Sequence, residues 1–308
     1  MTIEAALENV PFLILDGAMA TEMERRGYTI QDDLWSAVAL YRFPEVVREI
    51  HLSYLRAGAD IITTASYQAT RDGFMKKGFS QEEADGLMRK SVTIAKEARR
   101  QFLAEIQHKR PIWVAASMGP YGAYLADGSE YRGQYGKSRA ELAEFHEKRL
   151  DILLEEKPDL LAFETVPCLL EAEAIGDILQ KRPDSWAWIS FSCQDGERTC
   201  GGDWIRDCAA VLNDLPCVKA MGVNCTNPLC VASLIQEIRK ETEKPVVVYP
   251  NSGEIFDTEK REWTGSPVDF FAYGKRWQEA GARIIGGCCR TGPTQIRALK
   301  EVARKCSG

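Results

Sequence analysis

Three cysteines, at two places in the chain, are of the type and spacing that bind a metal. Cys225 follows Gly222-Val223-Asn224, and the adjacent pair Cys288-Cys289 follows Gly286-Gly287. Each place comes directly after a short apolar run typical of a buried strand. Three thiolates can fill three corners of a tetrahedron around Zn²⁺, and an open fourth corner marks a catalytic rather than a structural metal. We therefore predict a catalytic zinc site with these three cysteines as its ligands.

The ligand set also predicts the kind of reaction. A metal held by three thiolates carries excess negative charge, so it activates water poorly but still binds a soft sulfur ligand well. An incoming thiol would lose its proton on coordination and become the nucleophilic thiolate at neutral pH. The electrophile that suits a soft sulfur is a methyl carbon. If the donor is a sulfonium cation, the transfer removes charge, and a dry cavity favours that step.

Such a site requires strands that end on one face of the protein. Eight short runs are apolar throughout with little alternation, which is typical of parallel strands buried on both faces. Segments with helical spacing lie between them. Eight strands alternating with helices over 308 residues predict an α/β fold, namely a single-domain (β/α)8 TIM-type barrel. The predicted strands are Phe12–Leu15, Asp60–Thr64, Ile112–Ala116, Leu160–Phe163, Ala187–Phe191, Ala220–Val223, Val246–Tyr249 and Ile284–Gly286.

The main rival fold is a doubly wound open sheet. It predicts fewer strands and a phosphate-binding glycine turn near the start of the chain, but Asp16-Gly17-Ala18-Met19 lacks the G-x-G-x-x-G spacing. Two stretches without helical spacing, Tyr121–Gly136 and Asn251–Pro267, are predicted to be long loops after strands. Long ordered loops of this kind usually serve a site.

Polar residues at the predicted strand ends indicate the rest of the substrate. Catalytic residues of a barrel lie at the carboxyl ends of the strands, where Asp16 and Glu164 fall. These carboxylates could hold an ammonium group, and backbone N–H groups in Gly17-Ala18-Met19 could take a carboxylate. Thiol, ammonium and carboxylate together describe an amino-acid thiol. Aromatic residues that could hold a cationic donor are Trp35, Tyr67, Tyr121, Tyr249 and Phe256.

The same residues allow other interpretations. The cysteines could be buried packing residues, Asp16 could only cap a helix, and Glu164 could be a buried ion-pair partner. A zinc-dependent hydrolase is a second reaction class, but it would favour His and carboxylate ligands, and none of the three histidines falls at a strand end. A non-catalytic thiol-binding or metal-binding protein would not require the two carboxylates.

Composition excludes several partners. The net charge is -6 without a dominant basic patch, so no nucleic acid is expected. No apolar run approaches the roughly 20 residues that span a bilayer, and Met1–Pro11 lacks the features of a signal peptide, so no membrane is expected. Ten cysteines diluted in a long chain favour reduced thiols and a cytoplasmic protein. The sequence predicts no oligomeric state.

Several motifs together resemble those of a known family. Asp16-Gly17-Ala18-Met19-Ala20-Thr21, Gly222-Val223-Asn224-Cys225 and Gly286-Gly287-Cys288-Cys289-Arg290 resemble the motifs of the homocysteine S-methyltransferase family. The resemblance runs along nearly the whole chain. The stretches Ala65–Thr70, Gly119–Tyr131 and Val248–Glu254 are similar to the branch, found in bacteria and plants, that uses S-methylmethionine.

The resemblance implies that residues 1–308 form a homocysteine-binding (β/α)8 barrel domain that methylates L-homocysteine to methionine. It places Zn²⁺ on Cys225, Cys288 and Cys289, and the homocysteine amino group near Asp16 and Glu164. S-methylmethionine would be the preferred donor, giving two methionines, and S-adenosylmethionine a second donor. Selenocysteine or selenohomocysteine is an alternative acceptor for the same site.

Overall fold

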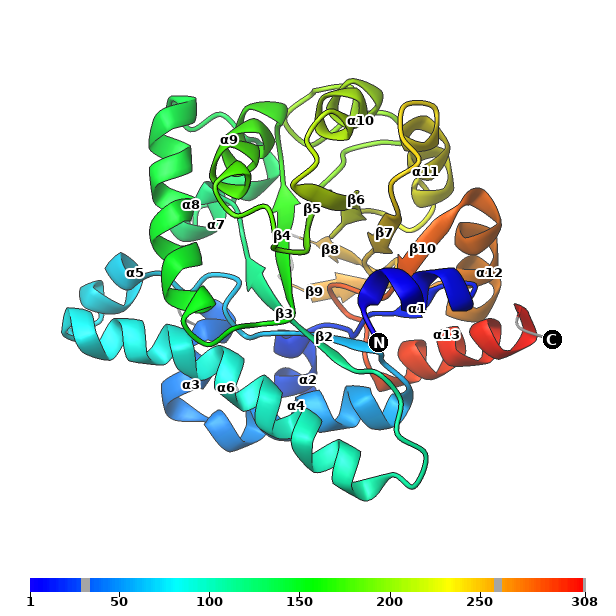
Figure 1. Ribbon diagram of the computed structural model, residues 1–308, viewed down its shortest axis with the longest axis horizontal. Helices are drawn as coiled ribbons and strands as arrows, with labels where there is room; N and C mark the ends of the chain where they lie inside the picture. Colours follow the sequence, from blue (N-terminus) through cyan, green and yellow to red (C-terminus); the bar gives the residue numbers. More distant parts are fainter. Residues whose placement is uncertain (29–33, 258–261, 307–308) are drawn as a thin grey trace.

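Eight parallel strands form a nearly closed barrel at the centre of the molecule (Figure 1). The structure, a computed structural model, describes residues 1–28, 34–257 and 262–306. The strand order is β1-β10-β7-β6-β5-β4-β3-β2, and the two ends of this sheet meet at a parallel bridge between Leu15 and Ile61. The predicted (β/α)8 architecture is confirmed. The strands are β1 Leu13–Ile14, β2 Ile61–Thr63, β3 Trp113–Met118, β4 Leu160–Val166, β5 Ala187–Phe191, β6 Val218–Asn224, β7 Val246–Tyr249 and β10 Ala282–Ile285.

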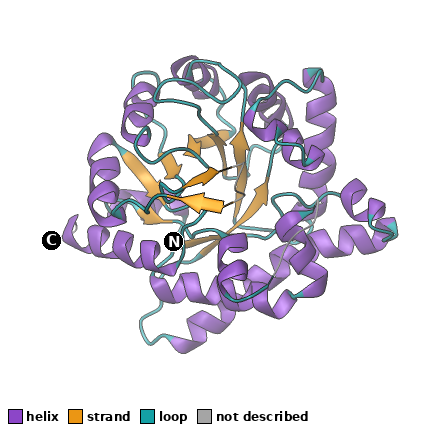
Figure 2. Cartoon of the chain, turned by 180° about the vertical axis from the view of Figure 1, so that it is seen from behind, coloured by secondary structure: helices purple, strands orange, loops and turns teal. Residues whose placement is uncertain are grey.

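Helices surround the barrel and follow its strands in turn (Figures 1 and 2). Their sequence signals include capping boxes, as at Ser80 before α6 and Ser138 before α8, where the serine and the third helical residue, a Glu, bond reciprocally. The helices are α1 Ile3–Asn9, α2 Met19–Arg25, η1 Trp35–Val38, α3 Ala39–Arg42, α4 Pro44–Ala57, α5 Arg71–Lys76, α6 Gln81–Glu105, α7 Tyr121–Leu125, η2 Ser129–Tyr131, α8 Arg139–Leu154, α9 Leu169–Gln180, α10 Ile205–Asn213, α11 Val231–Arg239, α12 Phe270–Ala280 and α13 Pro293–Cys306.

The apolar residues of the strands form two cores. One fills the barrel interior with large side chains such as Trp113 and Trp188, and the other lies between the strands and the surrounding helices. Helix α1 closes the end of the barrel that faces the viewer in Figure 1, where Ile3 and Leu7 join the interior core. Because both faces of every strand are covered, the strands are apolar throughout, and this explains why their positions could be predicted.

The two predicted long loops contain short regular elements. Tyr121–Gly136 includes α7 and η2, and Asn251–Pro267 includes an antiparallel hairpin of β8 Ile255–Asp257 and β9 Glu262–Thr264. Elements of three to five residues are too short to show a period in the sequence, so the prediction of long ordered loops did not include them. Residues 258–261 of the second stretch lie outside the described part.

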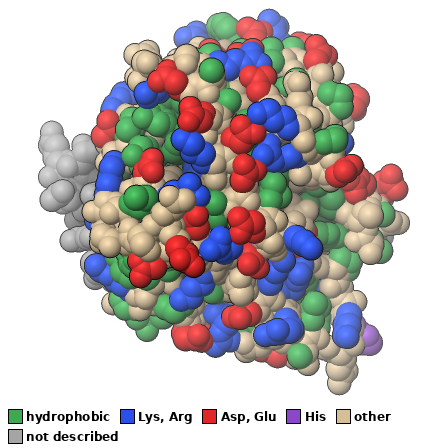
Figure 3. Space-filling view, turned by 60° about the vertical axis from the view of Figure 1, so that its left-hand side comes forward, with side chains coloured by type: hydrophobic (Ala, Val, Ile, Leu, Met, Phe, Trp, Pro, Cys, Tyr) green, Lys and Arg blue, Asp and Glu red, His purple; other side chains and the backbone are tan. Residues whose placement is uncertain are grey.

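Charged residues are distributed without a dominant sign. Acidic and basic side chains are interspersed over the face of the molecule that Figure 3 shows. Within the described ranges, no helix is both long and apolar enough to cross a bilayer.

Gly222 in β6 lies against the backbone of β7, and both strands border the site. A Cβ atom at this position would overlap the carbonyl oxygen of Val247 in β7. We expect Gly222→Ala to lower the free energy of unfolding by about 3 kcal/mol, because the two strands would have to separate. Urea denaturation followed by circular dichroism measures this change.

Gly86 in α6 provides the matched control, since no atom outside its own helix lies within 4 Å of a Cβ built there. Gly86→Ala should raise stability by roughly 0.5–1 kcal/mol, the usual gain for Gly to Ala in a helix. Equal stabilities for Gly222→Ala and the unchanged protein would show that β6 and β7 do not need this contact.

Candidate active site

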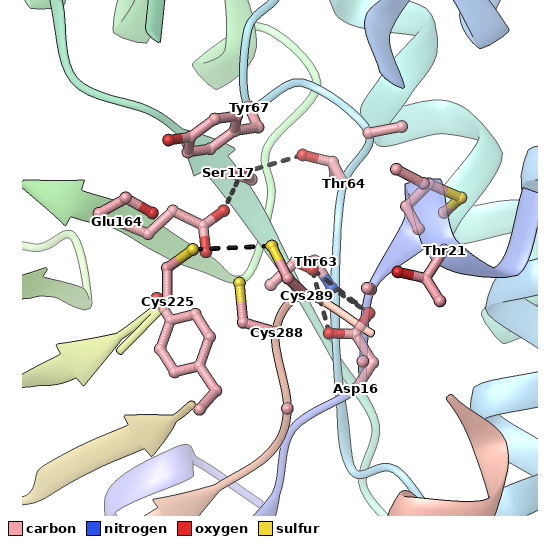
Figure 4. A pocket seen from close by; sticks show the side chains of 18 of the residues that line it. Asp16, Thr21, Thr63, Thr64, Tyr67, Ser117, Glu164, Cys225, Cys288 and Cys289 are labelled. Atoms are coloured by element: carbon pink, nitrogen blue, oxygen red, sulfur yellow. Dashed lines mark hydrogen bonds between the residues drawn. The ribbon is translucent and has the colours of Figure 1, made fainter. Parts of the chain in front are cut away.

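A pocket with a volume of about 120 Å³ opens at the carboxyl ends of the barrel strands (Figure 4). It is lined from the ends of β1, β2, β3, β4, β6, β7 and β10, so that residues distant in sequence meet there. All six residues that the sequence singled out for the site line this pocket: Asp16, Gly17, Glu164, Cys225, Cys288 and Cys289.

The sulfur atoms of Cys225, Cys288 and Cys289 all lie within 4.8 Å of one another. Figure 4 shows them turned toward a common point, with the carboxyl group of Glu164 beside them. The Sγ atoms of Cys225 and Cys289 are 3.7 Å apart. Among the described residues, no other group of three His, Cys, Asp or Glu side chains is close enough to share a metal ion. The arrangement therefore matches the predicted ligand set and belongs to the pocket.

Backbone strain at the ends of β4 and β6 helps to aim the side chains. Thr165 and Cys225 have positive φ values of 61° and 48°, a conformation that is rare outside glycine and costly for a β-branched residue. The buried Asn224 side chain holds this geometry: its Oδ1 accepts from the Thr165 N–H at 2.7 Å, and its Nδ2 donates to the Thr165 Oγ1 at 2.8 Å. Asn224 thus links the strand that carries Glu164 to the strand that carries Cys225.

The cysteine pair is fixed by hydrogen bonds from its backbone to the loop after β7. The N–H of Cys288 donates to the carbonyl of Pro250 at 2.7 Å, and the N–H of Cys289 donates to the Asn251 Oδ1 at 3.2 Å. A Cβ atom on Gly286 would come within 2.7 Å of the Leu15 Cβ, so the residue before this turn must be small. The Gly-Gly that precedes the pair therefore allows the chain after β10 to pass close to β1.

The three thiols are electrostatically coupled. Hydrogen bonds from Cys288, Cys289 and Tyr131 hold the pKa of the Cys225 thiol well below its ordinary value, and the Tyr131 Oη lies 3.1 Å from the Cys225 Sγ. The same contacts with Cys225 raise the pKa of the Cys288 and Cys289 thiols, because a second thiolate would lie beside the first. A dication compensates such a cluster, and three sulfur donors suit a soft or borderline metal such as zinc.

Asp16 and Glu164 are both buried, being only 3% and 9% exposed. The Asp16 carboxylate accepts hydrogen bonds from Thr63, at 2.9 Å from its N–H and 3.0 Å from its Oγ1, and Glu164 accepts one from the Ser117 hydroxyl. Burial raises the pKa of Glu164 to about 7 and the pKa of Asp16 well above its ordinary value, and the charge of Glu164 raises the latter further.

The structure does not support the two alternative roles of these carboxyl groups, a helix cap for Asp16 and an ion-pair partner for Glu164. Helix α2 begins after Ala18 with no side-chain cap, so Asp16 does not cap it. Within the described part of the chain, Glu164 forms no ion pair with a basic side chain. A helix cap and an ion pair therefore do not account for these two buried carboxyl groups.

Comparison with known proteins places the chain in a family. The sequence profile of the family described as homocysteine S-methyltransferase matches residues 13–303. The chain belongs to the homocysteine S-methyltransferase family.

Relatives of this family extend over nearly the whole chain. The homocysteine S-methyltransferase YbgG of Bacillus subtilis is 48% identical over 308 residues, which covers 98% of each chain. A selenocysteine Se-methyltransferase of Brassica oleracea is 46% identical, over 97% of this chain and 90% of the relative. The crystal structure of the homocysteine methyltransferase MmuM from Escherichia coli, in its metallated form, superposes with a TM-score of 0.89 at 44% identity, over 97% of this chain and 99% of that one.

The predicted donor-binding aromatic residues differ in their positions relative to the pocket. Tyr67 and Tyr249 line the pocket as predicted. Tyr121 does not: its ring packs against those of Phe145, at 5.0 Å between centroids, and Tyr135. Its proposed contact with a donor was therefore wrong, because the first turn of α7 directs the ring into an aromatic cluster. The side chains of Trp35 and Phe256 lie outside the described part.

Two residues of η2, Glu130 and Tyr131, also line the pocket but received no role from the sequence. They fall in a stretch without periodicity, and only its resemblance to the S-methylmethionine-using branch drew attention to it. Ser117 and Asn224 likewise act through contacts with Glu164 and Thr165, which are distant in sequence.

Proposed function

We propose that this protein catalyses zinc-dependent methyl transfer from S-methylmethionine to L-homocysteine, giving two molecules of methionine, with S-adenosylmethionine as a second donor. The observation that carries the proposal is the convergence of three cysteine sulfurs, within 4.8 Å of one another, with two buried carboxyl groups in one pocket. Groups that could activate a thiol and groups that could bind a cation therefore lie in the same pocket, at the carboxyl ends of the strands.

Cys225, Cys288 and Cys289 would hold the zinc ion. When bound there, zinc would lower the pKa of a substrate thiol so that it reacts as a thiolate at neutral pH. The donor set supports this assignment, because three sulfur ligands leave one position of a tetrahedral site for the substrate. The related Escherichia coli enzyme, whose metallated form has been solved, is consistent with a metal in this family.

Asp16 and Glu164 would bind the ammonium group of homocysteine. Burial raises the pKa of both carboxyl groups, and an ammonium group would compensate their negative charge through charge-assisted hydrogen bonds. Backbone N–H groups of Gly17, Ala18 and Met19, which line the pocket, would take the homocysteine carboxylate. The thiol, ammonium and carboxylate of the acceptor would thus each have a partner in the pocket.

The charge of the pocket favours a cationic methyl donor. Among the described residues that line it, none is Lys, Arg or His, whereas three are Asp or Glu. An anionic donor would meet uncompensated repulsion, and a sulfonium would be attracted. The aromatic rings of Tyr67 and Tyr249, which also line the pocket, could bind a cation by cation–π contact. The in-line geometry between the two sulfurs would then supply the proximity that accelerates a bimolecular transfer.

The deciding experiment is methionine formation from L-homocysteine and S-methylmethionine by the zinc-loaded protein. We expect rapid formation, with two methionines per homocysteine consumed, and slower formation from S-adenosylmethionine. Absence of product with zinc shown to be bound would reject the sulfonium donors while leaving the thiol site. A protein treated with a chelator serves as the control and should be inactive until zinc is restored.

A selenium acceptor is the second candidate, favoured by the 46% identity to the Brassica oleracea protein named selenocysteine Se-methyltransferase. The same assay with selenocysteine and selenohomocysteine in place of homocysteine would compare the acceptors. A larger kcat/KM for a selenol would make it the preferred acceptor.

We also propose that residues 1–308 act as one homocysteine-binding domain and that the protein works in the cytoplasm. The single domain is supported by the barrel, because its first strand, β1, pairs with its last strand, β10, and is bridged to β2. The beginning and the end of the chain are thus parts of the same sheet. The cytoplasmic location is supported by the ten cysteines, none of which forms a disulfide in the described part of the chain.

A further inference from the structure

Glu130 is a third carboxyl group in the pocket, and neither metal binding nor acceptor binding uses it. It lies in η2, next to Tyr131, and lines the same cavity as the cysteines. Its Oε2 atom is buried and has no hydrogen-bond partner among the described residues. A buried carboxylate oxygen without a partner is costly, so its retention in a binding pocket points to a ligand.

The loop holds Glu130 in place through its backbone. A Cβ atom on Gly122 would overlap the Glu130 N atom, so α7 packs directly on the backbone of η2. The Glu130 carbonyl accepts a hydrogen bond from the Ser192 Oγ at 3.3 Å, and the Asp127 Oδ1 accepts one from the Ser129 N–H at 2.9 Å. The position of the side chain in the pocket is thus built by contacts on both sides of it.

The charged groups around Glu130 do not neutralise it. Arg132, two residues away, approaches Asp127 at 3.9 Å and donates to the Ser129 Oγ at 3.4 Å, and it forms no ion pair with Glu130. Burial raises the pKa of Glu130, and the nearby Cys225 thiolate and Asp127 raise it further, while Arg132 lowers it only weakly. The described residues that line the pocket include no Lys, Arg or His either.

We infer that Glu130 binds the positive charge of the methyl donor and so selects sulfonium substrates. The inference rests on the proposed function. Asp16 and Glu164 are already assigned to the ammonium group of the acceptor, which leaves the third carboxylate for the donor. The donor carries an ammonium group and a sulfonium, and of these the sulfonium must lie beside the thiolate cluster. Its neighbour Tyr131 touches the Cys225 sulfur at 3.1 Å, so η2 lies beside the thiolate cluster where the donor must deliver its methyl group.

Glu130→Gln tests the inference, because it keeps the shape of the side chain and removes only the charge. We expect the KM for S-methylmethionine to rise about 10- to 100-fold, in line with the loss of one charge-assisted contact. The KM for homocysteine and the zinc content should not change. Glu130→Asp, which restores the charge on a shorter side chain, should recover part of the loss.

Asp127→Asn is the matched control. It removes the same charge from the same loop, but the Asp127 side chain lies outside the pocket, and the amide oxygen can still accept from Ser129. Its donor kinetics should equal those of the unchanged protein. A Glu130→Gln variant with an unchanged donor KM, or with donor and homocysteine KM values raised together, would overturn the inference alone. Failure of the unchanged protein to use either sulfonium would instead reject the proposed donor, and this inference with it.

Discussion

Cys225→Ser should abolish both zinc binding and methionine formation. A serine hydroxyl does not deprotonate as a thiol does and is a poor ligand for a soft site, so one of the three predicted metal ligands is lost. Replacing even the outer partners of metal ligands typically costs 10- to 100-fold, and we expect the loss of a direct ligand to exceed roughly a thousandfold in rate. Metal content measured by mass spectrometry and the rate of methionine formation test this together.

The other cysteines allow a sharp comparison. Cys289→Ser should behave like Cys225→Ser, since their sulfurs are 3.7 Å apart in the same cluster. Cys306→Ser should retain full metal content and activity, because Cys306 is exposed at the end of α13 and belongs to no cluster. Full occupancy with normal turnover in Cys225→Ser would refute the metal assignment.

Glu164→Gln should weaken the use of homocysteine by about 100- to 1000-fold in kcat/KM, the cost of losing a buried charge that faces an ammonium group. Gln can still accept the hydrogen bond from Ser117, so the change isolates the charge. Zinc content should remain complete. Steady-state kinetics with varied homocysteine at saturating S-methylmethionine measures the effect, and unchanged kinetics would remove Glu164 from the acceptor site.

The same substitution should stabilise the metal-free and substrate-free protein at neutral pH. The pKa of Glu164 is about 7 when folded, against an ordinary value of 4.5. Between these two values the folded state keeps a proton that the unfolded state has lost, so the free energy of unfolding falls as pH rises from 4.5 to 7. The loss is complete above pH 7 and amounts to about 3 kcal/mol, which Gln would not incur.

Urea denaturation of chelator-treated protein at pH 4.5 and pH 8 tests this expectation. The variant should match the unchanged protein at pH 4.5 and exceed it at pH 8. Glu24→Gln is the control, because Glu24 is exposed in α2 and its replacement should change stability by less than about 0.5 kcal/mol. If Glu164→Gln gave no gain at pH 8, the carboxylate would not be destabilising in the folded state. If Glu164→Gln were more stable than the unchanged protein but used homocysteine less well, the Glu164 charge would lower the stability of the fold and serve to bind the substrate.

The amino-acid sequence determined the strands of the barrel and the cysteines at their ends. Both faces of a parallel strand are buried, so each strand is a continuous apolar run that can be found without the fold. Predicted and observed bounds agree fully for β5 and β7. Once eight such strands are placed in a barrel, their carboxyl ends must meet, and this brings Asp16, Glu164 and the three cysteines into one pocket.

The tertiary structure alone decided how that pocket is completed. Glu130 and Tyr131 enter it from a stretch without periodicity, and Tyr121 in the same stretch turns away into an aromatic cluster. The positive φ values of Thr165 and Cys225 depend on Asn224, which reaches across from β6 to β4. Local propensity fixes the regular elements, but the direction of a loop side chain and the strain of a backbone are set by contacts between residues far apart in the chain.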